Sequence, residues 1–106
     1  MEPFLISFRD AEKEMPLLSG PPRTKGCKSG FVILRRGQSM PEHSTGQREE
    51  ALVILAGAGE ALFPGHDPIA LQESSLLYIP PETRHSIRNI GAEPLRYIYL
   101  VAPAVP

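Results

Sequence analysis

Short runs of apolar and β-branched residues alternate with turn-forming residues over most of the chain, from Phe31 onward. Each run is four to seven residues long, and none shows a 3.6-residue period beyond two turns, so helices are not indicated. Segments containing glycine or proline separate the runs at intervals of about 8 to 12 residues, which is the spacing of strands in a β-sandwich or barrel. The pattern predicts an all-β fold of about seven strands, at residues 31–36, 50–55, 60–63, 69–72, 76–79, 85–90 and 95–101.

The first thirty residues lack this regular pattern. Residues 2–8 could form one strand, and Asp10 could cap a helical turn over residues 10–15. Residues 17–30 contain Pro21-Pro22 and three glycines, which indicate a loop or an arm. We therefore expect residues 1–30 to form an N-terminal strand or arm that packs on a barrel made of residues 31–106.

The segment from Leu52 to Leu55 is apolar at every position, as in a strand that is covered on both faces. Its inner face would contribute to the core of the barrel. Its outer face needs another sheet, the N-terminal arm or a second subunit, and we expect a homodimer.

Composition excludes several classes of protein. The 106 residues are enough for one domain, and 11 Lys and Arg against 12 Asp and Glu give a net charge of −1. This balance provides no general attraction for nucleic acid or an anionic membrane. The one cysteine, Cys27, excludes an internal disulfide and a multi-thiolate metal site. The longest apolar run, residues 51–59, is about half of a membrane span, and the N-terminus has no secretory layout, so we expect a cytoplasmic protein.

Two polar clusters beside predicted strands carry two of the three histidines. The first runs from Gly37 to Gly57 and the second covers residues 80–89. Their spacing resembles the two motifs of the cupin family, G(X)5HXH(X)3–4E(X)6G and G(X)5PXG(X)2H(X)3N. The matching residues are Gly37, His43, Glu50, Gly57, Pro80, His85 and Asn89, and the three departures are Thr45 for a histidine and Ser74 and Glu82 for glycines.

The resemblance covers about residues 31–101 and implies a double-stranded β-helix, the jelly-roll barrel of the cupin family. It also implies that His43, Glu50 and His85 converge on one metal ion inside the barrel. The donor set agrees with this, because two imidazoles and a carboxylate suit Fe(II), and Mn, Ni or Zn could also bind. Three protein ligands leave positions open for water or substrate, which a catalytic metal requires.

Strand alternation predicts which way these ligands point. Glu50 would share its inward face with Leu52 and Ile54, and His85 would share its inward face with Ile87 and Asn89. Each ligand would then lie at the end of a largely apolar interior stripe, in a pocket that opens at one mouth.

The departures from the motif affect the metal site. Thr45 stands at the vacant ligand position, and we expect its hydroxyl to hydrogen-bond a metal-bound water. Gln47 could supply a substitute oxygen ligand. Glu82 replaces a glycine just before His85, and a glutamate at positive φ costs about 1 kcal/mol or more, so we expect a shifted turn geometry there.

Other side chains could serve the site. Glu50 and Tyr78 are candidate catalytic residues, since a carboxylate or a phenol can move a proton. We expect either Arg35 or Arg36 to point inward or toward the barrel mouth, where its planar fork would suit a carboxylate-bearing ligand.

Other residues have simpler interpretations. Tyr97 and Tyr99 alternate with apolar residues and are expected to pack in the core or at an interface. The third histidine, His66, is expected to be an exposed turn residue.

These expectations lead to a small metal-binding cupin that acts on a small polar or carboxylate-bearing molecule. Its reaction would be dioxygenase-like oxidation, or isomerase or lyase chemistry on a sugar acid. The alternative is a non-catalytic binding or sensor cupin in which the missing histidine marks a site without full metal competence.

Overall fold

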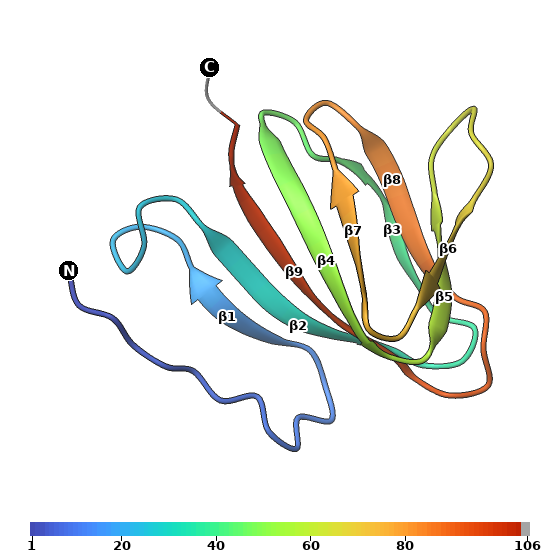
Figure 1. Cartoon of the computed structure of the whole chain (residues 1–106), viewed down its shortest axis with the longest axis horizontal. Helices are drawn as coiled ribbons and strands as arrows, with labels where there is room; N and C mark the ends of the chain where they lie inside the picture. The colour runs from blue at the N-terminus through green and yellow to red at the C-terminus, as the bar shows by residue number, and fades with distance from the viewer. Residues whose placement is uncertain (105–106) are drawn as a thin grey trace.

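The structure, a computed structural model, describes residues 1–104, and within that range every regular element is a β-strand. Figure 1 shows two twisted sheets that face each other and enclose the interior. The strands in chain order are β1 (Met15–Ser19), β2 (Lys28–Leu34), β3 (Ser39–Ser44), β4 (Arg48–Ala56), β5 (Ala58–Leu62), β6 (Ile69–Gln72), β7 (Ser75–Ile79), β8 (Arg84–Asn89) and β9 (Leu95–Pro103).

All strand pairs are antiparallel, and strands far apart in sequence lie side by side. One sheet has the order β1-β2-β9-β4-β7 and the other has the order β3-β8-β5-β6. This is a jelly-roll arrangement, so the predicted all-β, double-stranded β-helix fold is confirmed. The core between the sheets consists of Val32, Leu34, Leu52, Ile54, Ala61, Leu71, Ile79, Ile87, Leu95 and Tyr97.

The predicted inward faces of β4 and β8 are also found. Burial alternates along β4, where Leu52 and Ile54 are each 1% exposed and Leu55 is 38% exposed. On β8, His85 and Ile87 are buried, at 1% and 2% exposure. Because no bulge interrupts either strand between these residues, simple alternation predicts their direction correctly.

The N-terminal region differs from the sequence-based prediction. Residues 2–8 form no strand, and residues 10–15 form no helical turn. Instead β1 pairs with β2, opposite a segment that was predicted as a loop. Pro16 lies in this edge strand, where the missing amide proton is tolerated. The preceding arm contacts the same sheet, since the ring of Phe8 stacks on Phe31 with 5.5 Å between centroids.

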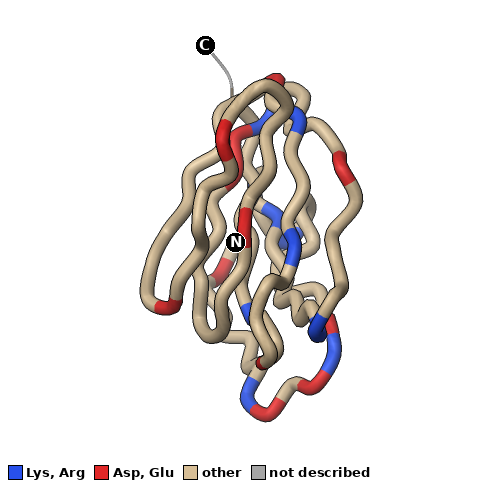
Figure 2. The backbone as a smooth tube through the Cα atoms, turned by 90° about the vertical axis from the view of Figure 1, so that its right-hand side faces the viewer, with Lys and Arg blue, Asp and Glu red and all other residues tan. Residues whose placement is uncertain are grey.

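The molecule is flattened, with principal extents of 41 × 36 × 21 Å. Acidic and basic residues are intermixed along the chain rather than separated by sign (Figure 2). The described part of the chain has no helix that is long and apolar enough to cross a membrane.

Candidate metal centre

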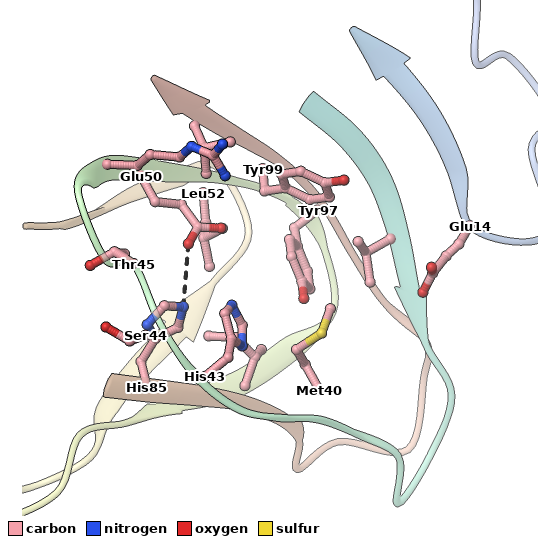
Figure 3. A pocket seen from close by; sticks show the side chains of 14 residues that line it. Glu14, Met40, His43, Ser44, Thr45, Glu50, Leu52, His85, Tyr97 and Tyr99 are labelled. Atoms are coloured by element: carbon pink, nitrogen blue, oxygen red, sulfur yellow. Dashed lines mark ion pairs between the residues drawn. The ribbon is translucent and has the colours of Figure 1, made fainter. Parts of the chain in front are cut away.

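Three titratable side chains from three strands meet at the open end of the barrel, where Glu50 and His85 are buried and His43 is exposed. His43 comes from β3, Glu50 from β4 and His85 from β8, and one ligand atom from each lies within 4.8 Å of the others. The two sheets contribute to the cluster together, because β4 belongs to one sheet and β3 and β8 to the other. Figure 3 shows the three side chains directed toward one another. The structure thus brings together the three residues that the sequence singles out as metal ligands.

The two histidines are direct neighbours across the β3–β8 ladder. His43 is the register partner of His85, and the ring centroids are 4.3 Å apart. The register shifts between Met40 and His43, so a bulge at Pro41 interrupts β3. A proline without an amide proton fits such a bulge. Pro41 therefore lies within β3, two residues before His43.

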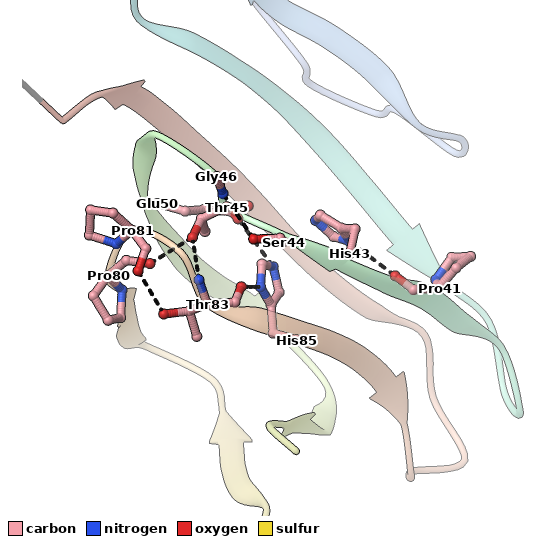
Figure 4. Close-up of polar contacts among 10 residues, drawn as sticks. All are labelled: Pro41, His43, Ser44, Thr45, Gly46, Glu50, Pro80, Pro81, Thr83 and His85. Carbon is pink, nitrogen blue, oxygen red and sulfur yellow. Dashed lines mark hydrogen bonds and ion pairs between the residues drawn. The ribbon is translucent and has the colours of Figure 1, made fainter. Parts of the chain in front are cut away.

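Each imidazole is oriented by a backbone carbonyl two residues earlier (Figure 4). Nδ1 of His43 donates to the carbonyl of Pro41 at 3.0 Å, and Nδ1 of His85 donates to the carbonyl of Thr83 at 3.0 Å. Because a carbonyl only accepts, these contacts place the proton on Nδ1 and leave Nε2 as a lone-pair donor. Carbonyl-bonded imidazoles of this kind are the usual form of metal-ligating histidines.

Glu50 and His85 form a buried pair. Nε2 of His85 is 3.3 Å from Oε1 of Glu50, and the two residues are 1% and 9% exposed. Burial lowers the pKa of His85, but the hydrogen bond to Glu50, the Thr83 carbonyl and the Glu50 charge together outweigh it, so the pKa is raised above 6.5. Without a metal ion, a proton on His85 compensates the Glu50 carboxylate.

The cluster opens into a cavity of about 310 Å³ whose walls are largely apolar. Leu52, Ile87, Val32 and Met40 line it, together with the ring of Tyr97. Burial, and next the Glu50 charge, raise the pKa of the Tyr97 phenol, so its hydroxyl stays protonated. Its side chain extends into the cavity between the cluster and Glu14 (Figure 3). Tyr97 belongs to the core, as predicted, and it also gives the cavity a hydrogen-bond donor.

Thr45 contacts the cavity, but its hydroxyl is engaged elsewhere. The hydroxyl donates to the carbonyl of Pro80 at 2.7 Å and accepts from the amide of Thr83 at 3.0 Å (Figure 4). These bonds tie the turn after β3 to the turn before β8. The expectation that the Thr45 hydroxyl hydrogen-bonds a metal-bound water is therefore wrong, because the hydroxyl bonds to the backbone of Pro80 and Thr83 instead. Gln47, the suggested substitute ligand, is exposed and is not part of the cavity wall.

Tyr78 lies outside the barrel, so the suggestion that it acts in the site is wrong. It is 53% exposed, and its hydroxyl donates to Oε1 of Glu49 at 2.8 Å. Its neighbour Ile79 is the fully buried residue, and alternation therefore turns Tyr78 outward. The hydrogen bond with Glu49 raises the pKa of Tyr78.

The two arginines expected near the site are also elsewhere. Arg35 and Arg36 are exposed in the turn after β2, and neither lines the cavity. The guanidinium of Arg35 donates to the backbone carbonyl of Glu12. The arginine in the cavity wall is Arg48, which precedes Glu50 by two residues and shares its strand. The sequence could have identified Arg48 as a cavity residue, because Arg48 lies two residues before Glu50 and residues two apart on a strand point to the same face.

The turn before His85 keeps a left-handed backbone. Glu82 has φ +54°, although it replaces a glycine of the motif. Its amide donates to the carbonyl of Gly46 at 2.8 Å, which anchors the turn to the end of β3. The expected shift to another turn geometry is therefore wrong, and the chain accepts the local strain.

The fold and the cluster define a jelly-roll barrel with two histidines and one glutamate at the end of its cavity. Comparison with known proteins gives the same assignment, since the cupin domain family model matches residues 30–101. The chain belongs to the cupin family.

The individual proteins that resemble this chain share a third of its residues or fewer over the aligned region. The chain is 33% identical over 88 residues to the protein named polyketide synthase CurC of Streptomyces cyaneus, covering 80% of this chain and 56% of that protein. The chain thus spans little more than half the length of that curated relative. An RmlC-like cupin of Methanocaldococcus jannaschii superposes with a TM-score of 0.79 at 23% identity, over 98% of this chain and 93% of the other. A predicted oxalate decarboxylase of Thermotoga maritima gives a TM-score of 0.78 at 21% identity, over 85% and 78%.

Proposed function

We propose that His43, Glu50 and His85 hold one divalent metal ion, and that the protein is a metal-dependent enzyme for a small oxygen-bearing molecule. The observation that carries the proposal is the convergence of three donor atoms within 4.8 Å at the end of an apolar cavity. The donor set fits Fe, Mn, Ni or Zn, and both imidazoles have the carbonyl partners that orient metal ligands.

The chain's own residues have defined parts in this proposal. When bound, a divalent ion supplies Lewis-acid polarisation of a ligand oxygen. Tyr97 keeps its proton and donates a hydrogen bond to an oxygen of the bound molecule. Leu52 and Ile87 exclude water from one side of the cavity, which strengthens the electrostatic interactions inside it.

The cavity and the names of two similar proteins support a proposal for the substrate class. A volume of about 310 Å³ fits a small molecule or one end of a longer one. One structural neighbour is named a predicted oxalate decarboxylase, and a sequence relative is named a polyketide synthase. Oxalate and polyketide chains share closely spaced oxygen atoms that can contact one metal ion together. We therefore propose oxidation of the dioxygenase type, or isomerase or lyase chemistry, on a molecule with such oxygens.

The alternative is a binding or sensor cupin without catalysis. The pair of Glu50 and His85 favours it, because a protonated histidine already compensates the carboxylate without any metal. In that case the protein would bind a small ligand in the same cavity and would carry no stoichiometric transition metal.

Metal analysis of the purified protein tests the proposal. After reconstitution we expect about one equivalent of a divalent transition metal in the wild type. His43→Ala and His85→Ala should lose it, since each removes one of three ligands. His66→Ala is the matched control, because His66 lies in the loop between β5 and β6, away from the cluster. Less than a tenth of an equivalent in the wild type would contradict the metal centre and leave the binding module.

A further inference from the structure

One arginine, Arg48, belongs to the wall of the cavity that contains the metal-ligand cluster. Arg48 is the first residue of β4. Because side chains two apart on a strand point to the same face, Arg48 lies on the same face of β4 as Glu50. Its backbone amide donates to the carbonyl of Thr45 at 3.2 Å, which fixes the β3–β4 turn from which the side chain extends. Arg48 is exposed as well as cavity-lining, and it therefore stands at the open end.

The guanidinium of Arg48 differs from most others in having no acidic partner within residues 1–104. It also makes no side-chain hydrogen bond there, so its planar fork is available to a ligand. Four other arginines are paired with carboxylates, namely Arg35 and Arg96 with Glu12, Arg84 with Glu42 and Arg88 with Glu60.

The charges around the cavity favour an anion once a metal ion is present. Glu14 and Glu50 contribute two negative charges, and Arg48 contributes one positive charge. A divalent ion beside neutral imidazoles turns this balance to one net positive charge. A guanidinium fork matches a carboxylate with two parallel hydrogen bonds.

We propose that Arg48 binds the carboxylate of the substrate while the substrate's other oxygens face His43, Glu50 and His85. The substrates of the site are then short carboxylic acids, or chains that end in one. This inference rests on the proposed metal centre, since the ion supplies the positive charge that outweighs the two glutamates. Arg48 would then have the carboxylate-binding role that was expected of Arg35 or Arg36.

Calorimetric titration of Mn²⁺-loaded protein with succinate, and with uncharged succinamide, tests the inference. Arg48→Gln should weaken succinate binding about 10- to 100-fold, the range for a charge-assisted pair of hydrogen bonds, and leave succinamide binding within about twofold. Arg48→Lys should fall between, because it keeps the charge and loses the fork. Arg36→Gln is the matched control, an exposed arginine outside the cavity wall.

The metal content of every variant separates this inference from the proposed function. Full Mn²⁺ occupancy with equal succinate affinity in Arg48→Gln and Arg36→Gln would overturn the role of Arg48 and leave the metal centre intact. A wild type that takes up no metal would instead defeat the metal centre. In that event the same titrations on metal-free protein test whether Arg48 binds the carboxylate. A lack of succinate binding to both the Mn²⁺-treated and the metal-free protein overturns the inference.

Discussion

At the scale of single residues, the proposed metal site depends on the protonation of His85. His85 is buried beside Glu50, and its raised pKa favours the charged imidazole in the metal-free protein. That interaction stabilises the fold fully below the unfolded-state pKa of about 6.5 and is lost as the pH rises through the higher folded-state pKa. A metal ion needs the neutral imidazole, so proton and metal compete for Nε2 of His85.

As the pH rises, the affinity for the metal ion should therefore increase, while the stability of the metal-free protein should decrease. Below the His85 pKa, each bound ion displaces one proton, and the affinity for Mn²⁺ should fall about tenfold per pH unit. Metal-free protein should lose stability over the window in which metal binding gains strength. Thermal unfolding with and without Mn²⁺ from pH 6 to pH 8.5 measures both trends.

His85→Gln serves as the reference for this experiment, because it removes the titrating group and leaves the other ionisable residues in place. The difference in stability between wild type and His85→Gln should shrink as the pH rises in metal-free protein. A difference that grows with pH would show that the His85 pKa is lowered by burial rather than raised by Glu50.

At the scale of elements, the turn after β3 and the turn before β8 are hydrogen-bonded to each other, and the two histidines lie on the strands next to these turns. The amide of Thr45 donates to the carbonyl of Thr83 at 3.1 Å, and the amide of Glu82 donates to Gly46. The Thr45 hydroxyl adds two further bonds across the same gap. Since β3 ends and β8 begins at these turns, their fastening sets the distance between the rings of His43 and His85.

The left-handed backbone at Glu82 gives a direct test of this arrangement. Glu82→Gly and Glu82→Ala both remove the exposed side chain, and they differ in how well they accept φ +54°. Glycine adopts positive φ without a Cβ penalty, so we expect Glu82→Gly to exceed Glu82→Ala in free energy of unfolding by about 1 kcal/mol. Urea denaturation measures the difference. An alanine variant at least as stable as the glycine variant would contradict the left-handed turn.

Sequence patterns predict the site better than its surroundings, for reasons that are local. Glu50 and His85 lie on strands that carry no extra residue themselves near these positions, so alternation gives their direction. The bulge at Pro41 and the pairing of β1 have no local signal, because both depend on the partner strand. Tyr78 could be assigned to either face until the neighbouring Ile79 was known to be the buried residue.

At the scale of the whole molecule, the outer face of the larger sheet is apolar across neighbouring strands. Phe31, Ile98, Val53 and Leu76 are consecutive register partners on β2, β9, β4 and β7. The N-terminal arm covers one end of this row, where Phe8 stacks on Phe31 and leaves it 3% exposed.

The β9–β4–β7 part of this face has no such cover within residues 1–104. Leu76 is 64% exposed and Leu100 is 37% exposed, with Leu55 and Tyr78 nearby. Contiguous apolar surface of this kind marks an interaction site in soluble proteins. The sequence-based expectation of a homodimer remains a proposal, and this is the face on which we expect the second copy to pack. The apolar part of this face can pack against the same surface of a second copy, as a two-fold interface requires.

Leu100→Glu should convert such a dimer into a monomer, because it places two carboxylates near each other in an apolar interface that cannot solvate them. Ile90→Glu is the matched control, since Ile90 is 54% exposed and lies just after β8 in the other sheet. Light scattering coupled to size exclusion gives the mass of both variants, and metal content checks that the barrel is intact. Because Leu100 points away from the cavity, the monomer should keep its metal. A monomeric wild type, or equal masses for the two variants, would rule out this face as the interface.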